Sequence, residues 1–464
     1  MAEARLLWTP RAWLRGGWRE GVLLCIGPDG RWSAVTPGVA TPPPGAAALP
    51  GPLLPALVNA HSHAFQRAFA GLAERREGAN DDFWSWRDRM YRVAASITPE
   101  QLRAIAAQLY VELLRGGYTQ VCEFHYLQHG PDGARYPDPL GMSWALADAA
   151  ADAGIGLTVL PVLYERAGFS QPDLRADQRR FAMSAKDVCA ARAAIARSGR
   201  ARVSAGVAIH SLRAAAPASI TSLRDMARTF DGPIHIHVSE QQAEVEDCMA
   251  AMGVRPIEWL AREGLLDSRW QLVHATHATP GEIEAVAKSG AAIVLCPSTE
   301  ANLGDGLTDL SGWLGAGVPM TIGSDSHVTR DWREELRLAD YGQRLALRRR
   351  NVAAAPAEGY PSTAGRLFAR AEAGSAAAAG EPAWGLVAGA RADALLVDET
   401  QEPLLGIPPA QLLDPLVFSS PGRAWRDVMV GGEWVIRGGR HADEDGIAAR
   451  FQSAMSAIWG DRPA

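Results

Sequence analysis

PALVNAHSH (residues 55–63) is a short apolar run that ends in two histidines, and it is the first of eight similar runs. The others are YTQVCEFHY (118–126), LTVLPVLYE (157–165), RVSAGVAIH (202–210), PIHIHVSE (233–240), WQLVHATH (270–277), AAIVLCPS (291–298) and PMTIGSDSH (319–327). Each run is typical of a buried β-strand and precedes a segment with a helical pattern. Eight alternations of strand and helix predict an α/β fold, a TIM-type (β/α)8 barrel.

Two of the predicted helices carry clear start signals. In TPEQLRAIAAQLYVELLRGG (98–117) Thr98 is the expected N-cap and Pro99 lies in the first turn, and Thr279 and Pro280 have the same roles in TPGEIEAVAKSG (279–290). The Ala-rich stretch ARAEAGSAAAAGE (369–381) indicates a helix or a surface linker without chemistry.

Short β-like runs separated by turn residues also occur at both ends of the chain. Residues 5 to about 50 end in the Pro/Gly-rich TPPPGAAALPG, and GLVAGARADALLVDE (385–399) and RAWRDVMVGGEWVIRGGRH (423–441) follow the barrel segment. We therefore predict a small β-sandwich built from both termini. The expected domains are 1–50 and 385–464 for the two parts of the sandwich, and 51–384 for the barrel.

The composition excludes several classes of protein. A net charge of -6 without long like-charge runs gives no footprint for nucleic acid or an anionic membrane, so a small molecule is the expected partner. No signal-peptide core or membrane-spanning run is present in the sequence. The five cysteines form no CxxC pair and indicate free thiols in a reducing compartment, which predicts a cytoplasmic location.

Histidines gather where the predicted strands end, which is where a (β/α)8 barrel places its chemistry. His61 and His63 are two residues apart on one strand, so both side chains point to the same side. An HxH pair alone is compatible with two solvated histidines, but His237, His274 and Asp325 end the fifth, sixth and eighth runs. Together these residues predict a metal site.

Three neutral imidazoles and one carboxylate suit Zn²⁺, and Fe²⁺ or Mn²⁺ would also accept this set. We predict one metal ion held by His61, His63, His237 and Asp325. A second, bridged ion would usually need a modified lysine or a carboxylate between the sites. The two lysines, Lys186 and Lys288, lie in helical segments, and the fourth strand ends in His210.

The strand-end motifs HSH, HVSE, VHATH and GSDSH resemble those of the amidohydrolase superfamily. Within it, five longer segments are similar to the formimidoylglutamate deiminase family: NAHSHAFQRAFAGLAE (59–74), DDFWSWRDRMY (81–91), CEFHYLQH (122–129), AIHSLRA (208–214) and HVSEQQAEVEDCMAAMGVRPIEWL (237–260). The resemblance extends over nearly the whole chain, and TRDWREELR (329–337) matches least well.

This resemblance implies a zinc-dependent enzyme of histidine degradation, acting as a homodimer. The reaction would be the hydrolytic release of ammonia from N-formimino-L-glutamate, which leaves N-formyl-L-glutamate. The residues that correspond to substrate contacts are Gln66, Arg87, Tyr126, His210 and Arg213.

The residues suggest how such a reaction would proceed. Asp325 would accept a proton from the attacking water, and His274 would orient that water by a hydrogen bond. Glu240, three residues after His237, would pass a proton to the leaving nitrogen, although a solvated carboxylate at a helix start would look the same. Arg87 and Arg213 would bind the two substrate carboxylates.

Some alternatives remain open at this point. Arg87 and Arg213 could form surface salt bridges, Tyr126 could anchor a loop, and Gln66 could cap a helix. An aminohydrolase acting on a purine ring such as guanine would need the same metal and proton-transfer residues. A non-catalytic barrel that serves as a scaffold is the alternative from another class, and bound metal would argue against it.

Overall fold

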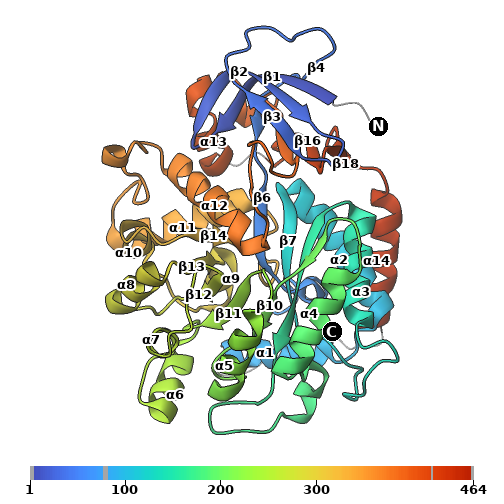
Figure 1. Cartoon of the computed structure of the whole chain (residues 1–464), viewed down its shortest axis with the longest axis vertical. Coiled ribbons are helices and arrows are strands. Elements are labelled where there is room, and N and C mark those ends of the chain that lie inside the picture. The colour runs from blue at the N-terminus through green and yellow to red at the C-terminus, as the bar shows by residue number, and fades with distance from the viewer. Residues whose placement is uncertain (1–4, 77–81, 420–421, 461–464) are drawn as a thin grey trace.

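The computed structural model describes residues 5–76, 82–419 and 422–460, and its centre is a parallel sheet rolled into a barrel (Figure 1). The strand order is β6-β7-β8-β10-β11-β12-β13-β14, and β9 also pairs with β8. The (β/α)8 prediction is confirmed, and each predicted run contains a strand. The bounds are β6 (Leu57–Ser62), β7 (Tyr118–His125), β8 (Gly156–Leu163), β9 (Val203–Ala205), β10 (Val207–Ile209), β11 (Ile234–Val238), β12 (Trp270–His274), β13 (Ala292–Leu295) and β14 (Met320–Ile322).

The barrel closes where the last strand meets the first. Ser62 and Asp325 form a parallel bridge, and the Asp325 backbone N–H donates to the His61 carbonyl at 3.0 Å. Gly323 permits this approach, because a Cβ at that position would lie 2.6 Å from the Cβ of His61. The closure therefore places Asp325 directly beside the two histidines of β6.

The outer helices begin where the sequence indicates. Thr98 caps α2 (Pro99–Arg115) and Thr279 caps α8 (Pro280–Ser289), each within a capping box. The segment 329–337 leads into α11 (Trp332–Leu347), capped by Asp331. The other helices around the barrel are α3 (Gly141–Ala153), α4 (Ala185–Arg197), α5 (Pro217–Ala227), α6 (Gln242–Met252), α7 (Pro256–Arg262), α9 (Pro297–Leu303) and α10 (Leu310–Gly315), with 3₁₀ turns η1 (Ala64–Ala68), η2 (Ala176–Phe181) and η3 (Pro356–Glu358).

The Ala-rich stretch 369–381 is helical, which is one of the two alternatives that its composition predicted. It forms most of α12 (Thr363–Ala379), which packs against β6 and β14. Small side chains are needed there, because a Cβ on Gly374 would lie 2.4 Å from the Met320 carbonyl oxygen. Low side-chain volume thus reflects close packing of a helix on the barrel.

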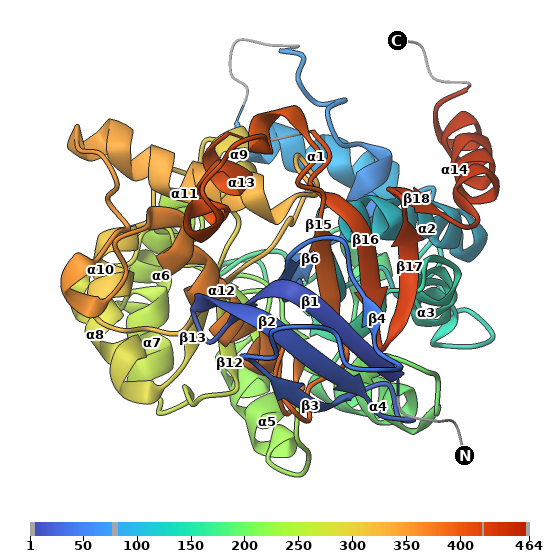
Figure 2. The same ribbon diagram turned by 90° about the horizontal axis from the view of Figure 1, so that it is seen from above.

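Both termini contribute to one sheet outside the barrel, as predicted (Figures 1 and 2). It curls around an apolar core of its own that includes Leu24, Trp32 and Leu396. The order is β18-β17-β16-β15-β5-β1-β2-β3, with β4 beside β1. The bounds are β1 (Arg5–Leu14), β2 (Gly17–Ile26), β3 (Trp32–Thr36), β4 (Ala47–Ala48), β5 (Leu53–Leu54), β15 (Ala394–Val397), β16 (Trp425–Val430), β17 (Glu433–Arg437) and β18 (Arg440–His441).

The C-terminal segment also contains helices that the β-like pattern did not indicate. The last, α14 (Glu444–Trp459), packs against α2 of the barrel, and α13 (Leu413–Phe418) packs against α11 and α12. Short turns η4 (Glu402–Leu404) and η5 (Pro409–Gln411) precede α13. The expected domain bounds at 1–50, 51–384 and 385–464 stay a prediction, and their outermost residues, 1–4 and 461–464, lie outside the described chain. None of the described helices combines the length and apolar character required to cross a bilayer.

Candidate active site

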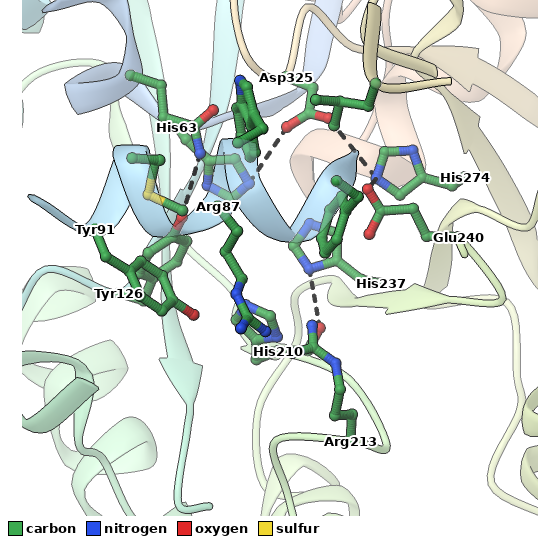
Figure 3. A pocket seen from close by; sticks show the side chains of 15 residues that line it. His63, Arg87, Tyr91, Tyr126, His210, Arg213, His237, Glu240, His274 and Asp325 are labelled. Carbon is green, nitrogen blue, oxygen red and sulfur yellow. Dashed lines mark hydrogen bonds and ion pairs between the residues drawn. The ribbon is translucent and has the colours of Figure 1, made fainter. Parts of the chain in front are cut away.

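The four predicted metal ligands lie together at the carboxyl ends of the barrel strands. Nε2 of His237 is 3.0 Å from Nε2 of His61, and Oδ1 of Asp325 is 3.3 Å from Nε2 of both His61 and His63. All four side chains are buried, and Figure 3 shows three of them around one point. Residues 176 positions apart in sequence, such as His61 and His237, thus share one small polar cluster.

The surrounding hydrogen bonds orient these imidazoles. Nδ1 of His63 lies 3.0 Å from the Phe124 carbonyl oxygen, and Nδ1 of His237 lies 2.9 Å from that of His210. An N–H at Nδ1 donates to each carbonyl, which leaves a lone pair on Nε2 directed into the cluster. Burial lowers the pKa of His61 to about 3 and also lowers those of His63 and His237.

These observations fit a bound metal ion. Neutral imidazoles with free Nε2 lone pairs and an ionised carboxylate are the donors that a divalent transition metal requires. Nε2 of His61 lies 3.0 Å from the lone pair on Nε2 of His237, so a proton or a cation must lie between the two nitrogens. Among the described residues, His61, His63 and Asp325 are close enough to share one ion, and so are His61, His237 and His274.

His274 is surrounded by carboxylates. Its Nε2 is 3.6 Å from Oε1 of Glu240 and 3.7 Å from Oδ2 of Asp325, and its Nδ1 is 3.3 Å from Oε1 of Glu300. Burial alone would lower the pKa of His274, but these negative charges raise it to about 10. The charges around His274 therefore favour its cationic form, and its Nε2 faces both Glu240 and Asp325.

The backbone at this rim is strained. Five of the nine described non-glycine residues with positive φ lie here: His274 (φ 68°), Asp325 (φ 45°), Ser239, Ala275 and His327. Such conformations cost free energy and persist only where the surroundings hold them. The residues at this rim are thus held in unusual backbone conformations, as is common at functional sites.

The predicted substrate residues line the same pocket as the metal cluster. Gln66, Arg87, Tyr126, His210 and Arg213 face it together with His63, His237, Glu240, His274 and Asp325. Helix α1 (Phe83–Ala94) covers this pocket and supplies Arg87 (Figure 3). Asp81, the first residue of the segment DDFWSWRDRMY (81–91) that overlaps α1, lies outside the described chain.

The two arginines give the pocket a positive end. Arg213 is only 8% exposed, and its Nη1 is buried without a hydrogen-bond partner among the described residues, as is Nε of Arg87. The side-chain amide of Gln66 donates to the Tyr126 hydroxyl at 3.3 Å, so these two predicted substrate contacts are hydrogen-bonded to each other. The pocket therefore has one end with potential metal donors and one cationic end, which we call the metal-ligating end and the anion-binding end after the roles proposed for them below.

Sequence reasoning missed several residues of this site. Phe83, Trp86, Met90 and Tyr91 of α1 line the pocket with Leu303 of α9. Tyr91 lies one helical turn after Arg87, and that spacing in the aromatic-rich motif could have indicated a shared face. Glu300 follows the seventh strand by a few residues, and no signal marked it.

Glu123 was also missed, although it lies in the quoted CEFHY segment. It accepts from the Ser62 hydroxyl at 2.8 Å and from the Ala64 backbone N–H at 2.5 Å. Burial raises its pKa to about 8. Its hydrogen bonds connect β7 to the backbone around His63, so it positions the histidine pair rather than facing the pocket.

A cluster of histidines and an aspartate at the C-terminal rim of a (β/α)8 barrel, next to a second acid and a cationic histidine, defines a metal-dependent hydrolase. The model of the Amidohydrolase family matches residues 53–435. The chain belongs to the amidohydrolase family, which is metal-dependent, and it is a hydrolase.

Comparison with individual proteins shows which amidohydrolases this chain is similar to. Formimidoylglutamate deiminase of Pseudomonas aeruginosa is 44% identical over 456 residues, which span 97% of this chain and 99% of the relative. A 5-methylthioadenosine/S-adenosylhomocysteine deaminase of Natronomonas pharaonis is 30% identical over 387 residues, which span 83% of this chain and 81% of the relative. The crystal structure of an amidohydrolase from Brucella melitensis has a TM-score of 0.92 at 41% identity, with 98% and 99% of the two chains covered. These findings confirm the resemblance predicted from the motifs.

Proposed function

We propose that this protein hydrolyses N-formimino-L-glutamate to N-formyl-L-glutamate and ammonia, a step of histidine degradation. The observation that carries the proposal is the pairing of Arg87 and Arg213 opposite a metal-ligating cluster in one pocket. A substrate with two carboxylates and one formimino group matches such a pocket. The name of the 44% identical relative supports the same substrate.

His61, His63, His237 and Asp325 would hold one metal ion, and we expect Zn²⁺, with Fe²⁺ as the alternative. When bound, such an ion makes a water molecule acidic enough to act as a nucleophile at neutral pH. The barrel contributes the fixed orientation of the donors, through the carbonyl groups that bind Nδ1 of His63 and His237.

Asp325, His274 and Glu240 would provide the proton transfers and the hydrogen bonding that the reaction needs. Asp325 accepts the proton that water loses as its oxygen attacks the formimino carbon. His274 donates a hydrogen bond to that oxygen through Nε2. Glu240 delivers a first proton to the terminal nitrogen and then takes up the proton of the newly formed hydroxyl group. Asp325 passes the proton it took from water to the same nitrogen, so the C–N bond breaks, ammonia leaves, and the carbon keeps oxygen as a formyl group.

The other end of the pocket would fix the glutamate portion. Arg87 and Arg213 present guanidinium forks to the two carboxylates, and their buried N–H groups without partners are available for this purpose. The Tyr126 hydroxyl, the Gln66 amide and His210 would complete the polar contacts around the chain of the substrate. A purine would leave both guanidinium groups without an anion, which argues against the purine alternative.

An ammonia-release assay tests this proposal. Metal-loaded protein is incubated with N-formimino-L-glutamate, N-formimino-L-aspartate and guanine side by side, and the organic product is identified by mass spectrometry. We expect the highest kcat/KM with the glutamate derivative and N-formyl-L-glutamate as product. Turnover of guanine alone would overturn the proposal and favour a purine aminohydrolase.

Three further expectations accompany the proposal. Metal analysis of the purified protein should find about one zinc ion per chain. Size-exclusion chromatography with light scattering should give a homodimer. Fractionation of the source cells should place the protein in the cytoplasm, where its five free cysteines stay reduced.

A further inference from the structure

The two arginines of the pocket converge on one indole ring. Cζ of Arg87 lies 4.6 Å from the ring centre of Trp84, and Cζ of Arg213 lies 5.5 Å from it. Both distances fall within the range of an attractive cation–π contact. Trp84 and Arg87 belong to α1, whereas Arg213 follows β10 of the barrel. The ring therefore joins the helix that covers the pocket to an arginine of the barrel rim.

Trp84 lies outside the pocket that contains the metal ligands. Arg87 and Arg213 line that inner pocket, and Trp84 does not. A second hollow, of about 430 Å³, is lined by Trp84 together with the same two arginines and Arg175. The two guanidinium side chains thus form part of the wall between the hollows, and Trp84 supports them from the outer side. Trp84 thus reaches the inner pocket indirectly, through the two arginines and through Phe83, whose ring meets the indole edge-on at 5.0 Å.

The arginine pair needs such support. Two cations in one wall that is shielded from water repel each other. Glu244 and Glu240 act on Arg213 electrostatically, but no described residue forms an ion pair with it. The ion-pair partner of Arg87 among the described residues is its exposed neighbour Asp88, at 3.6 Å. The negative face of an indole attracts a guanidinium without using its N–H groups. Stacking on Trp84 consequently offsets part of the repulsion and leaves the donors free for anions.

Tyr91 makes a related but less selective contribution. Its ring centre is 5.5 Å from Cζ of Arg87, and its hydroxyl bonds that of Tyr164 at 3.1 Å, which ties α1 to β8. Because Tyr91 also lines the inner pocket, its removal would alter substrate contacts directly. Trp84 is the residue whose effect can be separated from contact with the substrate.

We propose that Trp84 is a positioning residue that holds Arg87 and Arg213 as a pair and thereby sets the preference for dicarboxylate substrates. This inference rests on the proposed function for the identity of the substrate. A substrate with one carboxylate needs only one arginine in place, whereas a dicarboxylate needs both. Loss of the indole should thus weaken dicarboxylate binding more than monocarboxylate binding.

Steady-state kinetics of Trp84→Leu and Trp84→Phe test the inference. With N-formimino-L-glutamate we expect Trp84→Leu to raise KM by about tenfold and to change kcat by less than about twofold. With N-formiminoglycine, which has one carboxylate, the rise in KM should be much smaller. Trp84→Phe keeps an aromatic face and should restore most of the affinity. A general folding defect would instead lower kcat and protein stability together.

Trp144→Leu is the matched control. Trp144 of α3 is partly buried and stacks with Arg200 at 4.9 Å, and neither lines the inner pocket or the second hollow. Its removal deletes a similar contact and should leave KM unchanged. In an Arg213→Met background, Trp84→Leu should add little, because one of the two partners of the ring is already absent.

Calorimetry separates failure of this inference from failure of the proposed function. If wild-type protein does not hydrolyse N-formimino-L-glutamate, the proposed function fails, and binding of glutarate is compared between wild type and the Trp84 variants. Weaker glutarate binding in Trp84→Leu than in Trp84→Phe and Trp144→Leu supports the inference. Equal binding, or an unchanged KM for an active enzyme, overturns it.

Discussion

The two ends of the pocket are built in different ways. At the metal-ligating end, His61 and His237 lie on barrel strands and His63 directly follows β6. Backbone carbonyls accept hydrogen bonds from Nδ1 of His63 and His237. At the anion-binding end, Arg87 comes from the covering helix α1 and Arg213 from a loop, and both rest on the ring of Trp84. One end is fixed by hydrogen bonds from imidazoles to backbone carbonyls, and the other by stacking of side chains.

This difference suggests that the two ends of the pocket have separate functions. Chemistry at a metal tolerates little displacement of its ligands, and strand ends held by main-chain bonds provide that rigidity. Recognition of a flexible dicarboxylate requires entry and release, which a covering helix on side-chain contacts can allow. We therefore expect changes at the metal-ligating end to abolish turnover and changes at the anion-binding end to alter substrate binding.

The largest effect is expected for Asp325→Asn. The substitution removes a metal-ligating charge and the proposed proton acceptor, so kcat/KM should fall by at least about 1000-fold. Activity and bound metal are measured on the same samples. Asp445→Asn, which alters a side chain that is 96% exposed, is the control and should behave as wild type. A variant with near-normal turnover would contradict the assignment of the metal-ligating end.

Arg213→Met probes the opposite end. It deletes a buried guanidinium while keeping part of the apolar volume, and kcat/KM should fall roughly 100-fold, or about 3 kcal/mol, mainly through KM. Arg213→Lys should recover only part of this loss, because an ammonium cannot bind a carboxylate as a fork. Arg228→Met, at a side chain that is 65% exposed, is the control. An unchanged KM would remove Arg213 from the substrate site.

The contact between the first and last strands offers a purely structural test of the rigid end. Gly323→Ala would place a Cβ 2.6 Å from that of His61 and should destabilise the protein by about 1–3 kcal/mol. A lower melting temperature and weaker metal retention are the expected results. Gly315→Ala in α10 has no atom within 4 Å of its new Cβ and should change neither quantity. Equal melting curves for the two variants would argue that this close approach is unimportant.

The same contrast explains what could be predicted from the sequence. Period-2 alternation places His61 and His63 on one face, and the barrel rule brings His237 and Asp325 to the same rim, so the metal cluster follows from local pattern and topology. Arg87 and Arg213 were assigned only through a resemblance to a known family. No local rule states which arginine of a covering helix turns inward.

The residues that support the site escaped prediction for a similar reason. Trp84, Glu300 and Glu123 act through contacts between segments that are distant in sequence, such as Glu123 with Ser62 across 61 positions. For the Ala-rich stretch that became α12, helix and surface linker both stayed open, because composition does not show which surface a helix packs against. Burial and partner identity are tertiary properties, and one sequence gives only their average tendencies.

The smallest effect is expected for Glu300→Gln, which tests the role of a charged His274 at the metal-ligating end. Burial lowers the pKa of His274, and Glu240 and Glu300 raise it to about 10, so the imidazolium is present below that pH and is lost above it. Removing the Glu300 charge should lower this pKa, move the alkaline limb of the kcat profile to lower pH, and reduce kcat about tenfold. Glu284→Gln on the exposed face of α8 controls for loss of a distant charge. An alkaline limb that stays in place would mean that the cationic form of His274 is not needed, and that the metal-ligating end works without a charged donor beside it.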